Sequence, residues 1–336
     1  MRDAFFSELA ELFVRDDRAV FVTGDLGYKL FDSLVQIDRK RVVNFGIREP
    51  SMIGYAAGLG KTGLLPFVYS IVPFLTLRCL EQIKLDLCYN RCSVVLVGVG
   101  GGLAYGPNGP SHHGPDDVGT LSCLPGLRIL TPGDPHEVRT CIKAIPDLKG
   151  PTYLRLGRNK EPELSAQVVH PLEIVRPRIL TQGDEGTIVS FGSVGSNVLR
   201  AGKILRDQGI KPRIVNLMTF RPFPEEQLLR LLKDGAPVVT VEEHVASGGL
   251  GHRMAAMIAT NGCSNPFRML AIPDRFPDFC LDHDAALKWA GLDPKSIARE
   301  LLALFNRSAA SARMGGIDQI WQPPVSYKYS ALSAKT

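Results

Sequence analysis

The chain has 336 residues, of which 45% are hydrophobic and 22% are charged. The length predicts two domains, and the composition is that of an ordinary globular protein. With 39 basic and 34 acidic side chains the formal charge is only +5, and there is no Lys/Arg run. This balance argues against nucleic acid as the main partner. No apolar stretch reaches the roughly 18 residues that a membrane helix needs.

The N-terminus lacks a positively charged lead into a long apolar run, so we expect no secretory signal. Seven cysteines are spread along the chain without a CxxC pair. That spread disfavours both a disulfide framework and a structural zinc site. We therefore expect a reduced, cytoplasmic protein that contacts neither nucleic acid nor a membrane.

Helix-like and strand-like segments alternate in the first half of the chain. Apolar residues at helical spacing are followed by short apolar runs that end in glycine or polar residues. The predicted strands are 19–22, 41–45, 67–70, 93–97, 126–130 and 152–156, and the predicted helices are 5–14, 50–60, 75–88 and one that begins near 134. This order predicts a mostly parallel, doubly wound sheet.

The segment 163–180 interrupts the alternation, with Pro171 and Pro177 and no clear period, and we interpret it as a linker. A second alternation follows, with predicted strands at 187–191, 213–217 and 238–241 and predicted helices at 197–208, at 224–232 and after Gly251. The sequence thus predicts two three-layer α/β domains with mostly parallel sheets, at 1–162 and 181–308. We expect an irregular tail at 309–336.

The predicted helix 50–60 is rich in small residues, namely Gly54, Ala56, Ala57 and Gly58. Glycine costs about 1 kcal/mol in a helix interior, so a compensating interaction is expected. Close approach of another helix would provide one. We expect this helix at a subunit interface.

The glycine run 98–102 follows a predicted strand, as a dinucleotide-binding loop would. It lacks the third glycine of the GxGxxG fingerprint, and no helix follows it. A nucleotide site is therefore disfavoured. The run still indicates that the backbone approaches another group closely here.

Two segments carry side chains suited to catalysis, and spacing alone leaves their roles open. His112 and His113 belong either to a polar surface loop or, through one of them, to a site at the carboxyl ends of the strands, where open α/β sheets bind ligands. Adjacent residues on an extended segment point in opposite directions, so the pair is a poor chelate. Glu49 opens a helix, either as a charge favoured by the helix dipole or as a buried acid whose pKa is raised by desolvation.

These pieces occur together in the order of a known family. The segments that carry the resemblance are Gly24-Asp25-Leu26, Gly46-Ile47-Arg48-Glu49, the stretch from Gly106 to His113, Leu156-Gly157-Arg158-Asn159, and, further on, 239–244 and 248–251. From about residue 3 to residue 305 the chain resembles the pyrimidine-binding and C-terminal domains of transketolases. Deoxyxylulose-phosphate synthases and the beta subunits of 2-oxo acid dehydrogenases are more distant relatives.

The resemblance implies thiamine diphosphate as the cofactor, whose chemistry the protein orients and tunes. Glu49 is then the acid that hydrogen-bonds the aminopyrimidine ring nitrogen, a role that requires it to stay protonated in a buried, apolar setting. Gly46 and Ile47 precede it in the same motif and count as cofactor-binding residues. Phe74 is the expected aromatic stacking partner of the pyrimidine.

The resemblance also implies substrate contacts. His112 lies beside the reacting carbonyl, where it can donate a hydrogen bond or shuttle a proton. Arg158 holds a sugar phosphate, which suits its fork of donors. Asp25 is expected to contact the substrate. Asn108 stands where transketolases usually have an acidic residue against a donor-sugar hydroxyl, which leaves the donor open; Pro50 replaces the family's glutamine.

A whole domain of full-length transketolases is missing, with its Gly-Asp-Gly…Asn motif that holds Mg2+ and the diphosphate. The near match at 183–186 has the wrong spacing. We therefore expect no metal ligands in this chain and a separate N-terminal subunit that supplies them, in an assembly with two copies of each. The implied activity is transfer of a two-carbon ketol unit between sugars, phosphorylated ones above all. A synthase-like or dehydrogenase-beta-like subunit and a non-catalytic regulatory partner are the alternatives, the last disfavoured by the retention of Glu49, His112 and Arg158.

Overall fold

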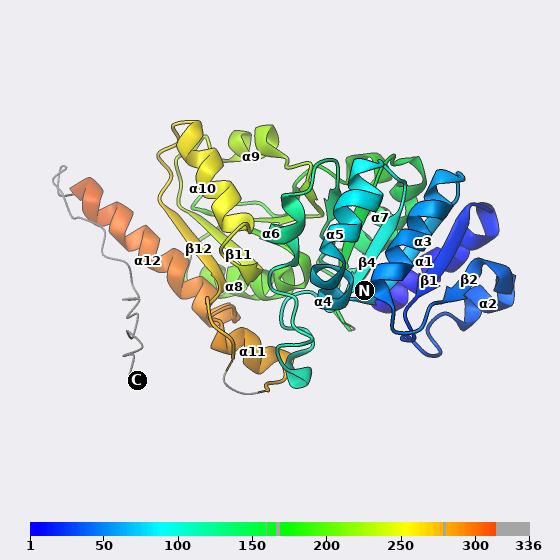
Figure 1. Ribbon diagram of the computed structural model, residues 1–336. Coiled ribbons are helices and arrows are strands. Elements are labelled where there is room, and N and C mark those ends of the chain that lie inside the picture. The colour runs from blue at the N-terminus through cyan, green and yellow to red at the C-terminus, as the bar shows by residue number, and fades with distance from the viewer. Residues whose placement is uncertain (159, 166–168, 278–279, 314–336) are drawn as a thin grey trace, which may run out of the picture.

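The computed structural model describes residues 1–158, 160–165, 169–277 and 280–313, and in it the chain folds into two α/β units that lie side by side (Figure 1). Each unit is a mostly parallel sheet with helices on both faces, which confirms the predicted fold class. Within the described residues no helix is both long and apolar enough to cross a membrane.

The first sheet has seven strands in the order β10-β5-β6-β4-β3-β1-β2. Six of its strands come from the first half of the chain, and those pair in parallel. The seventh, β10, comes from the second half and pairs antiparallel with β5. The strands are β1 (Ala19–Thr23), β2 (Val42–Asn44), β3 (Leu65–Ile71), β4 (Val95–Val99), β5 (Arg128–Leu130), β6 (Thr152–Leu156) and β10 (Thr219–Arg221).

Two apolar layers cover this sheet because successive side chains of a strand point to opposite faces. In β1, Phe21 packs on one face with the helices α1 (Arg2–Arg15) and α7 (Pro135–Ala144). Val20 and Val22 pack on the other face with α3 (Glu49–Lys61) and the π-helix η3 (Ile83–Tyr89). The short helices α2 (Asp32–Asp38) and α6 (Asp117–Ser122) complete the unit.

The second sheet has five strands in the order β12-β11-β8-β9-β7, with only β7 antiparallel to its neighbour. Its strands are β7 (Arg178–Thr181), β8 (Thr187–Phe191), β9 (Arg213–Leu217), β11 (Val238–Val245) and β12 (Phe267–Ile272). α8 (Gly195–Asp207), α11 (His283–Trp289) and α12 (Pro294–Arg313) cover one face. α9 (Glu225–Leu231) and α10 (Leu250–Thr260) pack on the other.

Three segments differ from the sequence expectation. The predicted helix 75–88 is broken into α4 (Val72–Leu75), a 3-10 turn (Leu77–Cys79), α5 (Leu80–Gln82) and η3. The break follows Thr76, whose hydroxyl and backbone amide both donate to the Val72 carbonyl, at 2.7 and 2.9 Å, and such back-bonding bends helices. β7 contains the last three residues of the expected linker 163–180, and α12 runs five residues into the expected tail; residues 314–336 lie outside the described part.

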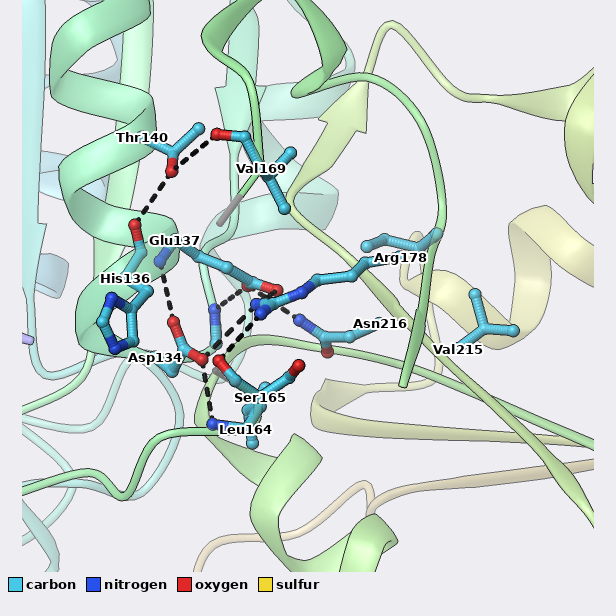
Figure 2. Close-up of polar contacts among 12 residues, drawn as sticks. Asp134, His136, Glu137, Thr140, Leu164, Ser165, Val169, Arg178, Val215 and Asn216 are labelled. Atoms are coloured by element: carbon cyan, nitrogen blue, oxygen red, sulfur yellow. Dashed lines mark hydrogen bonds and ion pairs between the residues drawn. The ribbon is translucent and has the colours of Figure 1, made fainter. Parts of the chain in front are cut away.

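A buried polar cluster joins the two units (Figure 2). Arg178 of β7 donates to Glu137 at 2.8 Å and to Asp134 at 3.4 Å, both near the start of α7. The second carboxylate oxygen of Glu137 accepts from the Gly133 amide and from the side chain of Asn216 in β9. Burial, together with the nearby charge of Asp134, raises the pKa of Glu137 to about 6.

Candidate active site

Glu49 begins α3 directly after the loop that leaves β2, and its side chain is only 2% exposed. Its Oε2 accepts a hydrogen bond from Nη1 of Arg78 at 2.8 Å. Burial of this acid was expected, but the expected apolar setting was wrong because a guanidinium lies against the carboxylate.

Arg78 links Glu49 to the predicted aromatic partner. Its guanidinium carbon lies 4.4 Å from the centroid of the Phe74 ring, which is cation–π distance. Phe74 in turn meets the imidazole of His112 edge-on, with centroids 5.2 Å apart. Three predicted site residues from distant parts of the chain are therefore connected through one arginine that motif reasoning missed. The available signal was an arginine four residues after the predicted stacking aromatic.

His112 and Arg158 lie against the same ring. The Tyr105 centroid is 6.2 Å from that of His112 and 5.0 Å from the guanidinium carbon of Arg158. The sequence analysis did not identify Tyr105, whose ring connects His112 to Arg158, the residue predicted to bind phosphate. Arg158 is exposed, as a substrate contact requires. Its neighbour Asn159 lies outside the described residues.

The two adjacent histidines have different environments. His112 is half-buried, with Nδ1 3.0 Å from the Ser111 hydroxyl. His113 is buried, and its Nε2 lies 3.3 Å from the Gly106 carbonyl oxygen. The structure therefore places one histidine against the Phe74 and Tyr105 rings and uses the other to brace the loop. Asn108 sits exposed on the same loop, in the 3-10 turn Gly106–Asn108.

Asp25 and Gly46 form a second group at the ends of β1 and β2. The Oδ1 of Asn44 accepts from both backbone amides, each at 2.9 Å. The carboxylate of Asp25 accepts from the Tyr28 hydroxyl at 2.8 Å and from Asn44, and these two hydrogen bonds lower the pKa of Asp25.

Gly24 connects this group to the acid of α3. A Cβ at Gly24 would lie 3.2 Å from the Gly46 oxygen and 3.8 Å from Cγ of Glu49, so a larger side chain would crowd the turn. Gly46 itself has a φ of +66°, which favours glycine. Ile47, next to it, is 77% exposed, which is unusual for a large apolar side chain.

Among the described residues, no three His, Cys, Asp or Glu side chains are grouped so that they could hold a metal ion. The residues connected through Arg78 and Tyr105 comprise one acid, one imidazole, two guanidinium groups and the aromatic rings between them. Such a set can bind a flat, nitrogen-rich ring and an anionic substrate group.

Comparison with known proteins identifies the family of both units. The family model of the transketolase pyrimidine-binding domain matches residues 1–162, and that of the transketolase C-terminal domain matches residues 176–297. An apulose-4-phosphate transketolase subunit of Phocaeicola vulgatus is 31% identical over 302 residues, which cover 90% of this chain and 96% of that protein. The 6-deoxy-6-sulfo-D-fructose transketolase subunit of a Clostridium species is 30% identical over 302 residues, covering 89% and 92%. A solved structure described as a split gene transketolase, an inactive beta4 tetramer, has a TM-score of 0.81 at 28% identity and covers 91% of this chain and 97% of that one.

Proposed function

The chain belongs to the transketolase family, and from this premise we propose that it is the C-terminal subunit of a split, thiamine-diphosphate-dependent transketolase. The observation that carries the proposal is coverage: the chain spans nearly the whole length of subunits that form one part of such enzymes. The proposed reaction moves a two-carbon ketol unit between sugars in the cytoplasm.

The residues of this chain fit the pyrimidine half of the cofactor. The Arg78 guanidinium is a flat group of N–H donors that lies on the Phe74 ring and donates to Glu49. The guanidinium thus stands where a flat nitrogen donor contacts both that ring and that carboxylate, and an aminopyrimidine has the same chemical character. Glu49 and Phe74 would hold the ring, with Gly46 and Ile47 at its edge.

Thiamine diphosphate, when bound, supplies the carbon chemistry that breaks and forms the bond beside a ketose carbonyl. Glu49 holds a proton at the ring nitrogen and so tunes that chemistry. His112 lies where it can donate a hydrogen bond to the carbonyl oxygen of the substrate, and the contact with Phe74 fixes its ring. Asn108 and Asp25 contact sugar hydroxyls.

The proposed substrate class is based on Arg158. Its exposed guanidinium lies over Tyr105 with its donor fork available to an anionic group. The two relatives named above are transketolase subunits for apulose-4-phosphate and 6-deoxy-6-sulfo-D-fructose, which carry a phosphate and a sulfo group. We propose a sugar phosphate, or a sugar with a similar terminal anion, as the substrate of this protein.

The partner would be a separate chain that carries the Gly-Asp-Gly…Asn motif and so holds Mg2+ and the diphosphate. Two copies of each chain would make the active assembly. The small residues of α3 support a close contact: Gly54, Ala57 and Gly58 line a shallow depression of about 300 Å³ between α3 and η3.

Affinity capture of the tagged chain from its native lysate, with thiamine diphosphate and Mg2+ present, tests the proposal. Mass spectrometry should recover a second chain with the Gly-Asp-Gly…Asn motif. The captured complex should transfer a ketol unit between sugar phosphates. Uptake of pyruvate in place of a ketose would favour the synthase-like or dehydrogenase-like alternatives. Capture of a complete transketolase with its own pyrimidine-binding domain would favour the regulatory alternative.

A further inference from the structure

The end of β11, in the second unit, contacts the segment of the first unit that carries His112. Three successive residues take part. Oε1 of Glu243 accepts from the Leu103 amide at 2.7 Å, Nε2 of His244 accepts from the Gly119 amide at 3.0 Å, and the Val245 amide donates to the Pro115 carbonyl at 2.7 Å. The end of β11 is therefore hydrogen-bonded to backbone that lies more than 120 positions earlier in the sequence.

Both ends of the loop 102–114 meet at Glu243. Gly102 and Gly114 exchange backbone hydrogen bonds of 2.8 and 2.9 Å, which closes the loop. Arg155 donates through Nη2 to the Gly114 carbonyl at 3.2 Å and to the Glu243 carbonyl at 3.0 Å. A Cβ at Gly102 would clash with the Glu243 side chain, so the glycine admits the carboxylate at the loop base.

His283, at the start of α11, holds the same carboxylate. Its Nε2 lies 2.8 Å from Oε1 of Glu243, which is only 1% exposed, whereas His283 is 35% exposed. Burial alone would raise the pKa of Glu243, but the charge and hydrogen bond of His283, with Arg155, lower it. The segment before α11 also supports the loop tip, because Gly106 packs against the Leu281 carbonyl.

We propose that Glu243, held by His283, is a positioning residue that fixes the loop 102–114 so that His112 and Asn108 face the sugar. The catalytic meaning of this inference rests on the proposed function, since that function assigns the two loop residues to the substrate. Glu243 itself is buried and acts through the Leu103 amide. In this way the second unit sets the geometry of a site whose side chains belong to the first.

Hydrogen exchange of the full chain tests the anchor without any activity. In Glu243→Gln, and independently in His283→Gln, we expect amides of 102–114 to exchange faster by about tenfold or more, as for the loss of a hydrogen bond to a charged group. Glu242→Gln is the matched control. That buried neighbour accepts from the Leu250 and Gly251 amides of α10 and should leave loop exchange at the wild-type rate. Unchanged exchange in both test variants, or equal opening in the control, would overturn the proposal.

Kinetics of the captured complex test the consequence. We expect Glu243→Gln to lower kcat by roughly tenfold to 100-fold through misplacement of His112, with a smaller change in KM for the phosphorylated substrate, because Arg158 lies outside the loop. An open loop with an unchanged kcat would refute the positioning role. If the wild-type complex transfers no ketol unit, the proposed function fails, whereas the exchange experiment still decides whether Glu243 anchors the loop.

Discussion

Arg78 donates to the buried carboxylate of Glu49 from a largely open position: the two side chains are 43% and 2% exposed, and their N–O distance is 2.8 Å. The charge of Glu49 is thus compensated from the side on which Phe74 lies. Any ligand that inserts between this carboxylate and this ring has to replace or displace the guanidinium. The pair therefore couples ligand binding to the stability of the free subunit.

A double-mutant cycle measures the interaction energy between Arg78 and Glu49. Arg78→Met leaves Glu49 buried without its partner, and we expect the free energy of unfolding to fall by about 2 kcal/mol, below the full cost of breaking a buried pair because Arg78 is partly solvated. In a Glu49→Gln background the same change should cost only about 0.5 kcal/mol. Urea unfolding of the full chain supplies the four values. Equal losses in both backgrounds would mean that the ion pair contributes nothing.

The cluster between the two units predicts a pH dependence of stability. The pKa of Glu137 is raised to about 6 in the folded chain from its ordinary value of 4.5. The folded state therefore binds more protons between these values, and the contribution of this group to stability falls as pH rises from about 4.5 through 6, by roughly 2 kcal/mol.

Urea unfolding of the wild type and of Glu137→Gln at pH 4.5, 5.5 and 7 checks the sign. The stability of the wild type should decline relative to that of the variant across this interval. Glu226→Gln, at an exposed ion pair with Arg230, serves as the control. A difference between wild type and Glu137→Gln that stays constant with pH would contradict the raised pKa.

The sequence was most informative where structure is local. The strands β6, β8 and β9 have the predicted bounds because each is a short, largely apolar run that directly follows a proline or a glycine. β10 was missed: it is three residues long, and its partner β5 lies about 90 positions away. β12 was missed because its half-buried sequence alternates poorly.

The same contrast between local and long-range structure holds for the candidate site. Glu49, His112 and Arg158 could be found from contiguous motifs. Arg78 has only its spacing of four residues from Phe74 as a local signal, and its contact with Glu49, 29 positions earlier, follows from the fold. The contact of Tyr105 with Arg158 and that of Leu103 with Glu243 depend on how the sheet and the second unit fold. No local pattern encodes such pairs.

The proposed role of Arg158 in binding the substrate anion predicts a selective kinetic effect. Arg158→Ala should raise KM for a phosphorylated sugar by roughly tenfold to 100-fold, as expected for a charge-assisted contact worth about 1.5–3 kcal/mol, with little change in kcat. The unphosphorylated sugar should be used equally by variant and wild type. An equal loss for both sugars would remove Arg158 from phosphate recognition.

We expect Asn108 to influence which ketose the enzyme uses as donor. An amide both donates and accepts hydrogen bonds, whereas a carboxylate only accepts, so Asn108→Asp should shift the ratio of kcat/KM values among ketose donors toward ordinary ketose phosphates. Competition between two donors in one reaction measures this ratio directly. Gln227→Glu, at an exposed side chain of α9, controls for added charge. An unaltered donor profile would show that Asn108 does not select the donor.

Ketol transfer by the affinity-captured complex, with wild-type and Glu49→Gln bait, tests the proposed function most directly. If this chain supplies the acid that tunes thiamine diphosphate, both baits should capture the same second chain in the same ratio. The variant should then lose activity by about 100-fold or more, the range of a general acid–base group. Equal transfer by the two complexes would contradict the catalytic role of Glu49, as would a wild-type chain that is captured alone and inactive.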